Sequence, residues 1–92
     1  MRSRTTKSFR KGLAELPEPV RRQARKAYRL FAENPMHPSL AFKKVHSVKP
    51  VWSARVNLDV RAVGVIEADT ILWFWVGPRD QYETLLGKMG VV

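Results

Sequence analysis

Two arginines, Arg55 and Arg61, are the residues whose types and spacing most clearly suggest chemistry. They flank the short loop 57–59, which joins two segments rich in β-branched residues. If these segments pair as a hairpin with a three-residue loop, Arg55 lies directly across from Arg61, and like charges so placed destabilise a sheet. A planar guanidinium matches the oxygens of a phosphate, so the pair indicates an anion-binding site. The alternative is that the two long side chains diverge into water.

The overall charge also indicates an anionic partner. The chain has 92 residues, with 17 Lys and Arg against 8 Asp and Glu, and a net charge of +9. Residues 1–50 hold 13 basic and 3 acidic side chains, whereas residues 51–92 hold 4 and 5. Clustered positive charge is typical of proteins that bind nucleic acids. An acidic protein partner, or a contribution to solubility alone, would also explain it.

Composition excludes several classes of protein. A chain of this length predicts a single domain, residues 1–92, with one modest core. The absence of cysteine excludes a disulfide framework, a thiolate zinc site and a cysteine nucleophile. The longest apolar run, residues 71–76, is too short to cross a bilayer, and no apolar targeting segment follows the basic start, so we expect a cytoplasmic protein. His37 and His46 are isolated from matched carboxylates, so we expect neither a metal nor a cofactor.

Hydrophobic spacing predicts two helices in the first third of the chain. Ser8 is expected to cap a short helix that ends near Leu16, where Pro17 stops it. A second helix is expected to run to about Glu33, with an apolar stripe formed by Val20, Ala24, Ala27, Tyr28 and Phe31. The basic residues between them are interpreted as a solvated face, with contact to an acidic partner as the alternative. The short turn predicts an antiparallel helix pair.

After Pro38 the period changes from that of a helix to that of a strand. Four β-rich runs, residues 40–45, 51–56, 60–66 and 70–76, predict an antiparallel meander because their connections are short. Residues 1–7 are either a frayed tail or a short edge strand, and residues 79–88 would form one or two helical turns. The predicted fold class is therefore α+β: an N-terminal antiparallel helix hairpin on one face of a four-stranded antiparallel sheet, followed by a short C-terminal helix.

Alternation along the strands predicts which side chains face the helices. A tight turn centred on Ala68 and Asp69 sets the register of the last two strands. The residues expected to lie opposite each other are Ile66 and Ile71, Gly64 and Trp73, and Ala62 and Trp75. Large residues facing small ones are typical of a packed layer, so this face is assigned to the core, together with Trp52 and Ala54. The other face is expected to be open and to carry Arg55, Arg61, Val63, Val65, Leu72, Phe74 and Val76.

An ordered series of short segments carries a likeness to a known family. The segments include Leu16-Pro17, Asn34-Pro35, His37-Pro38-Ser39-Leu40, Phe42-Lys43-Lys44-Val45-His46, Val51-Trp52-Ser53-Ala54-Arg55-Val56, Arg61-Ala62-Val63-Gly64, Trp73-Phe74-Trp75-Val76-Gly77 and Arg79-Asp80-Gln81-Tyr82. Over about residues 9–86 the set resembles toxins of the RelE/ParE superfamily, which belong to bacterial type II toxin–antitoxin pairs. The resemblance implies a toxin that either cleaves mRNA, usually on the ribosome, or poisons DNA gyrase, and that a small antitoxin neutralises.

For the nuclease branch, the resemblance also implies the site residues. Those expected to act on the scissile phosphate are Arg55, Arg61, Arg79 and Tyr82. Those expected to bind RNA are Lys43, Lys44, His46 and Phe74, with Trp52 as the alternative to Phe74 for stacking a base. Trp73 and Trp75 are assigned to the core, and His37 is interpreted as a turn residue. For His46 a role as acid or base competes with that of an ordinary surface histidine.

The implied chemistry is attack by the ribose 2′-OH on the adjacent phosphate, which needs no metal ion and no nucleophile from the protein. Because arginine stays protonated, Tyr82 and Lys43 are the remaining candidates for proton transfer. Two positions depart from the family's pattern, since Arg79 stands where histidine is common and Val60 where tyrosine is common. An arginine cannot shuttle a proton near neutral pH, which shifts the expected mechanism towards electrostatics.

Three functions therefore compete at the level of sequence. The leading hypothesis is a metal-independent endoribonuclease whose partners are an antitoxin, mRNA and the ribosome. The second is a non-enzymatic inhibitor of DNA gyrase on the same fold, which would need no cluster of ionisable residues. The third is a degenerate toxin that only binds an antitoxin or nucleic acid.

Overall fold

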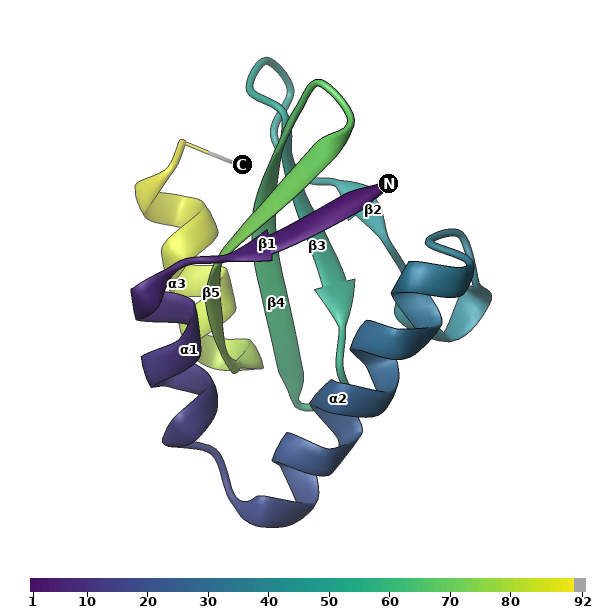
Figure 1. Ribbon diagram of the computed structural model, residues 1–92. Helices are drawn as coiled ribbons and strands as arrows, with labels where there is room; N and C mark the ends of the chain where they lie inside the picture. The colour runs from purple at the N-terminus through teal and green to yellow at the C-terminus, as the bar shows by residue number, and fades with distance from the viewer. Residues whose placement is uncertain (91–92) are drawn as a thin grey trace.

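The computed structural model describes residues 1–90, which form one mixed sheet with helices on both faces (Figure 1). The elements in chain order are β1 (Arg2–Thr5), α1 (Lys7–Ala14), α2 (Glu18–Glu33), the 3-10 helix η1 (Pro38–Leu40), β2 (Lys43–Lys44), β3 (Val51–Arg55), β4 (Val60–Glu67), β5 (Thr70–Pro78) and α3 (Arg79–Lys88). The strand order is β1-β5-β4-β3-β2. The α+β class is the predicted one. Among the helices of residues 1–90, none combines the length and apolar character that a membrane crossing requires.

The sheet has five strands rather than four, because residues 2–5 form the edge strand β1. β1 pairs in parallel with β5, from Arg2 opposite Thr70 to Thr5 opposite Trp73, so the sheet is not wholly antiparallel. Side chains of the helices cover part of its outer edge: Arg10 Nη1 donates to the Thr5 carbonyl at 2.8 Å, and the Tyr28 hydroxyl donates to the Ser3 carbonyl at 3.3 Å. Covered carbonyls make an edge less able to pair with another chain.

The two N-terminal helices occur where the sequence predicts them, with one correction at the first. Thr6, not Ser8, caps α1, since Thr6 Oγ1 accepts a hydrogen bond from the Phe9 amide at 3.1 Å. The Ser8 hydroxyl donates instead to the Phe74 carbonyl at 3.0 Å, which ties the start of α1 to β5. α1 ends at Ala14, slightly before the expected Leu16. In Figure 1 the helices diverge from their short connection as the arms of a V.

The main core lies between these helices and the sheet. Phe31 of α2 is 3% exposed and meets two other aromatic rings edge to face, Phe42 at 4.9 Å and Trp73 at 5.3 Å. Phe42 also stacks on Trp52 at 4.7 Å. Such pairs contribute about 0.5–1.5 kcal/mol each beyond the area they bury. The predicted assignment of Trp52, Ala54 and Trp73 to this core is confirmed.

The segment before β3 is less regular than predicted. The expected strand over residues 40–45 is reduced to Lys43–Lys44, and η1 precedes it. The backbone of Ala41 is left-handed, with a φ of 42°, which is incompatible with an extended strand. Leu40 and Phe42 nevertheless reach the core, with 2% and 9% of their surfaces exposed.

A β-bulge changes the register predicted for β4 and β5. Ile66 lies opposite Ile71 and Gly64 opposite Trp73, as expected. Beyond these pairs the register shifts, so that Val63 faces Trp75 and Ala62 faces Val76. The prediction of Ala62 opposite Trp75 is therefore wrong. Val76, which is 5% exposed, belongs to the core under α1 and α2, whereas Trp75 packs on the other face beside Tyr82, with ring centroids 6.4 Å apart.

That other face is not open, because α3 packs across its centre. The buried residues Val51, Val63 and Tyr82 form a second cluster with half-buried side chains of β5, of α3 and of the residue that caps α3, namely Phe74, Trp75, Leu85, Leu86 and Met89. The expectation of an open face failed since α3 extends over the full range Arg79–Lys88 rather than one or two turns. Side chains remain accessible at the two ends of this face, where Leu72 lies at one end and Arg55 and Arg61 at the other.

Candidate functional site

Three arginines lie together at one end of the sheet, the lower end in Figure 1. Arg55 is the last residue of β3 and pairs with Arg61 near the start of β4, which confirms the predicted register. Arg61 in turn lies opposite Gly77, two residues before Arg79 at the start of α3. The Arg79 amide donates to the Asp59 carbonyl at 2.7 Å, which attaches the first turn of α3 to the β3–β4 loop. We call Arg55, Arg61 and Arg79 the arginine cluster.

Arg61 is at the centre of the arginine cluster. Burial lowers the pKa of its guanidinium, and the positive charges of Arg79 and then Arg55 lower this pKa further, while Tyr82 and Asp59 act in the opposite direction. The charges are therefore close enough to repel one another. Arg61 Nη1 donates to the Asn57 carbonyl at 2.6 Å, so one end of the guanidinium also supports the loop. Within residues 1–90 its Nη2 and Nε take part in no hydrogen bond and can bind an anion.

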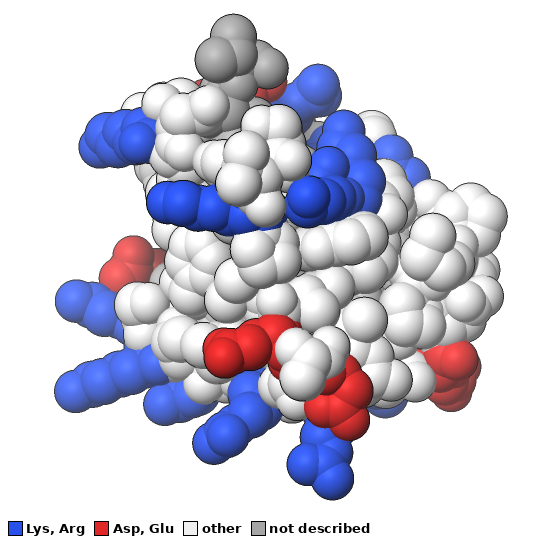
Figure 2. All heavy atoms as spheres, turned by 90° about the horizontal axis from the view of Figure 1, so that it is seen from above, with Lys and Arg blue, Asp and Glu red and all other residues white. Residues whose placement is uncertain are grey.

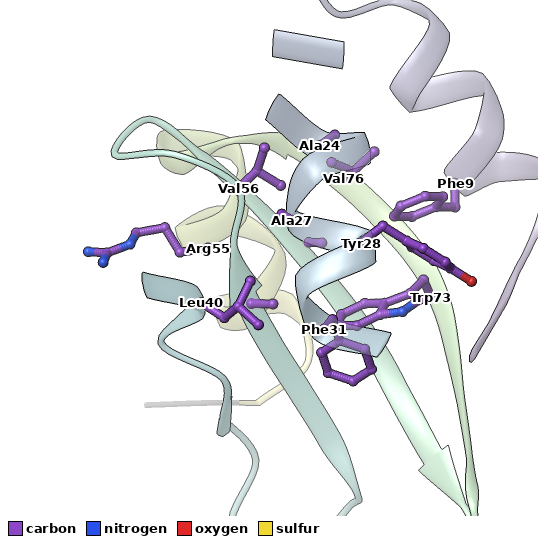
Figure 3. A pocket seen from close by; sticks show the side chains of 12 residues that line it. Phe9, Ala24, Ala27, Tyr28, Phe31, Leu40, Arg55, Val56, Trp73 and Val76 are labelled. Carbon is purple, nitrogen blue, oxygen red and sulfur yellow. The ribbon is translucent and has the colours of Figure 1, made fainter. Parts of the chain in front are cut away.

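The other members of the arginine cluster flank Arg61 with much of their donor capacity available. Arg55 is half-buried, and its Nε donates to the Ser39 carbonyl at 3.1 Å. Its guanidinium points away from the apolar core, as Figure 3 shows. Arg79 is exposed and lies 3.8 Å from Glu83, a solvated contact that holds neither side chain strongly. The arrangement gives several N–H groups at one end of the sheet for a single anionic group.

Tyr82 lies beneath α3 rather than at its surface. The ring is 9% exposed, and its hydroxyl donates to Ser53 Oγ at 3.1 Å. Ser53, on β3, is 2% exposed and was not anticipated from the sequence. The sequence feature that could have identified it is the position of a serine between Trp52 and Ala54 in an apolar strand, because a buried hydroxyl there needs a hydrogen-bond partner. The hydrogen bond between Tyr82 and Ser53 fastens α3, and with it Arg79, to the sheet.

The residues predicted to bind RNA do not form one cluster. Lys43 lies opposite Ser53 and shares the face of Arg55, whereas Lys44 lies opposite Trp52 on the other face. His46 lies beyond β2, near the start of β3, whereas Arg55 is the last residue of that strand. Its Nδ1 accepts hydrogen bonds from the amides of Val48 and Lys49, at 3.0 and 2.9 Å, so it organises a turn.

Phe74 is the extra residue of the bulge in β5 and is half-buried against the cluster under α3. It shares a face with Lys43, and its ring is only partly accessible for stacking. The roles predicted for Phe74, Lys43, Lys44 and His46 stay predictions. No group of three or more His, Asp and Glu side chains within residues 1–90 is placed to hold a metal ion.

Positive charge is not confined to the arginine cluster. The opposite end of the molecule, seen in Figure 2, has lysine and arginine side chains protruding from several of its margins, with acidic side chains between them. On α2 the residues Arg22, Lys26 and Arg29 are exposed and form no salt bridge within residues 1–90. A polyanion could therefore contact more than the arginine cluster alone.

Comparison with known proteins identifies the fold. No protein-family model matches the chain, and no curated protein sequence matches it significantly. Solved structures do match: a RelB–RelE antitoxin–toxin complex from Methanococcus jannaschii at 18% identity and a TM-score of 0.73, covering 89% of this chain and 96% of that one. YafQ from E. coli matches at 14% identity and a TM-score of 0.71, covering 89% and 98%.

The RelBE2 toxin–antitoxin complex from Mycobacterium tuberculosis matches at 21% identity and a TM-score of 0.67, covering 85% of this chain and 96% of that one. The likeness extends over nearly the whole of each chain, although few residues are identical. The chain therefore has the fold of RelE/ParE-type toxins, as the sequence predicts.

Proposed function

We propose that this protein is the toxin of a type II toxin–antitoxin pair and acts as a metal-independent endoribonuclease on mRNA. Its partners would be a cognate antitoxin, mRNA and the ribosome, and its place of action the cytoplasm. The observation that carries the proposal is the arginine cluster: Arg55 lies opposite Arg61 in the sheet, Arg79 begins α3 two residues after the partner of Arg61, and the charges of Arg79 and Arg55 act on Arg61. Repulsion among these positive charges raises the free energy of the folded protein when no ligand is bound, and a bound anion reduces that repulsion.

The reaction that suits the arginine cluster is an internal transfer within RNA. The ribose 2′-oxygen loses its proton and forms a bond to the adjacent phosphorus, and the bond from phosphorus to the 5′-oxygen breaks. The 5′-oxygen takes a proton from water, so the products are a 2′,3′-cyclic phosphate and a 5′-hydroxyl. Negative charge grows on the phosphoryl oxygens during this step. Donors already aimed at the growing charge lower the barrier, and removing one such donor typically costs about 10²–10³-fold in rate. Arg61 and Arg55 would stabilise these oxygens, with Arg79 towards the leaving 5′-oxygen.

The proton of the 2′-OH needs an acceptor other than an arginine. Lys43 is the exposed candidate on the face of Arg55. Tyr82 is the second candidate, but its hydroxyl lies under α3 and donates to Ser53. We assign Tyr82 the role of a positioning residue that holds Arg79 beside Arg61, and Lys43 the role of proton acceptor.

An antitoxin would act by covering charge as well as by blocking access. The net charge of +9 and the unpaired cations on α2 favour a partner with an acidic segment. Two of the matched structures are named as complexes of a toxin with an antitoxin, which supports the same kind of partner here.

The proposal is tested by induced expression in bacteria, followed by mapping of mRNA ends and of DNA double-strand breaks in the same cells. We expect cut messages, intact DNA and arrested growth. An Arg61→Ala variant should abolish the cuts, whereas Arg22→Ala, which removes an exposed charge from α2, should retain them. Broken DNA with intact messages would instead identify a gyrase poison, and healthy cells that make folded protein would identify a binding module.

A further inference from the structure

A polar groove lies next to the arginine cluster, on the side facing α2. It has a volume of about 230 Å³ and is bounded by α2 on one side and by η1 and the end of β3 on the other. Since a water molecule occupies about 30 Å³, the groove has room for several waters or for part of a ligand. Its two cations are Lys26 from α2 and Arg55 from β3, and its apolar floor includes Leu30 and Val56.

The chemistry of this groove is that of a site for one nucleotide. No acidic side chain lines it, so its two positive charges are not neutralised within it. Lys26 is exposed and forms no salt bridge within residues 1–90, and Arg55 bonds only the Ser39 carbonyl there. The cations at the rim suit the phosphate of a nucleotide, and the aliphatic side chains below them suit the flat face of its base.

An amide at the wall offers a polar contact as well. Gln23 of α2 lines the groove, and its Oε1 accepts a hydrogen bond from Asn57 Nδ2 at 2.7 Å. That bond leaves the Gln23 amide nitrogen with its donors available. It also links α2 to the β3–β4 loop that Arg61 supports, so the groove wall and the arginine cluster are joined through one loop.

Continuity with the arginine cluster favours an RNA strand as the occupant of the groove. Arg55 belongs to both places: it pairs with Arg61 across the sheet and also lines the groove towards α2. A flexible strand with one phosphate at Arg61 can therefore place its next phosphate between Arg55 and Lys26. The neighbouring apolar cavity between α2 and the sheet, shown in Figure 3, is only about 40 Å³ and too small for a base.

We propose that this groove binds the nucleotide adjacent to the scissile phosphate of a single-stranded RNA, with Lys26 and Arg55 on its phosphate. The inference rests on the proposed function, since it takes the arginine cluster as the place of the scissile phosphate. It adds a nucleotide-binding subsite beside α2, and Lys26 is a binding residue there. A protein segment in the same groove is the competing occupant.

The test measures binding of 2′-O-methyl oligonucleotides, which cannot be cleaved, by fluorescence anisotropy at several salt concentrations. Two lengths are compared, three and eight nucleotides, so that only the longer one is sure to reach both the arginine cluster and the groove. Lys26→Glu should weaken binding of the longer oligonucleotide about tenfold or more, the size expected for a lost charged contact. The slope of log affinity against log salt should fall by about 0.7 for one phosphate contact.

Arg22→Glu is the matched control, because Arg22 is exposed on the same helix, carries the same charge and does not line the groove. It should weaken both lengths equally and only slightly. Lys26→Gln provides a second variant if Lys26→Glu unfolds α2, and circular dichroism checks the fold of each. Equal effects of Lys26→Glu and Arg22→Glu on the longer oligonucleotide would overturn the proposal that the groove binds a nucleotide, while leaving the proposed function intact. Failure of the unaltered protein to bind either length would overturn the proposed function itself.

Discussion

The face of the sheet under α1 and α2 is closed by aromatic rings, whereas the face under α3 ends in the arginine cluster. On the first face Phe31 and Trp73 are 3% and 4% exposed and contact each other. On the second face α3 covers only the centre, through Tyr82, and Arg61 remains half-buried at the end.

The difference shows that the residues that stabilise the fold and those of the candidate site lie on opposite faces of one sheet. Burial lowers the pKa of Arg61, and the charges of Arg79 and Arg55 lower this pKa further, so the placement of these cations opposes folding. Burial of large apolar side chains offsets that cost on the opposite face, at about 25 cal/mol per Å². Residues of the two faces alternate along β3 and β4. A residue that packs in the first core is therefore followed in the sequence by one on the face of the arginine cluster.

The largest expected effect is the loss of Trp73. Trp73→Ala removes a ring that contacts Phe31 and fills the space over Gly64, where an added Cβ would lie 2.9 Å from Trp73 Cε3. We expect the free energy of unfolding to fall by about 3–5 kcal/mol, measured by urea denaturation. Trp75→Ala, on the half-buried side of the bulge, should cost less. An equal or greater loss for Trp75→Ala would contradict the faces to which the bulge assigns these rings.

The second prediction concerns the arginine cluster. Arg61→Lys keeps the charge but loses the planar fork that bonds two phosphate oxygens together. The rate of RNA cleavage should fall about 10²–10³-fold, measured on a short RNA with the purified protein. The free energy of unfolding should change by less than about 1 kcal/mol, because the charge is kept and Arg61 lies outside the two buried cores. Cleavage at the unaltered rate would remove Arg61 from the reaction.

The third prediction distinguishes positioning from proton transfer at Tyr82. Tyr82→Phe removes the hydroxyl that donates to Ser53 and should cost about 1 kcal/mol of stability. Because the hydroxyl is buried, we expect cleavage to slow only a few-fold and its pH profile to keep its shape. Ser53→Ala is the matched variant, since it removes the other partner of the same bond. A loss of about 10²-fold or more in Tyr82→Phe alone would make Tyr82 the proton-transfer group.

The smallest effect is expected at Glu18, on the exposed start of α2. A hydrogen bond from Arg21 lowers the pKa of the Glu18 carboxyl. The pair therefore stabilises the fold above the unfolded pKa of about 4.3, and this contribution is lost as the pH falls through the lower folded pKa. Thermal unfolding should show Glu18→Gln slightly less stable than the unaltered protein near pH 6 and equal to it near about pH 2. RNA cleavage near neutral pH should be the same in both proteins.

Much of the fold and part of the site follow from local patterns. Pro17 and Asn34-Pro35 bound α2, because a proline cannot continue a helix and restricts the residue before it. The short loop 57–59 brings Arg55 opposite Arg61, since few registers are compatible with both the loop and the alternation of apolar residues. A pairing set by one tight connection was therefore predictable, and so was the assignment of Trp52, Ala54 and Trp73 to the first core, although that of Trp75 and Val76 was not.

The tertiary structure decided what depends on segments distant in the sequence. Phe74 forms a bulge that turns Trp75 towards α3, and no local pattern marks the extra residue. The parallel position of β1 beside β5, the burial of Tyr82 on Ser53, and the groove shared by Lys26 and Arg55 likewise join distant elements. By itself the sequence determined its helices, its hairpins and its excess of positive charge, because these depend on neighbouring residues. Packing between non-neighbouring elements determined which face stayed accessible and which side chains meet there.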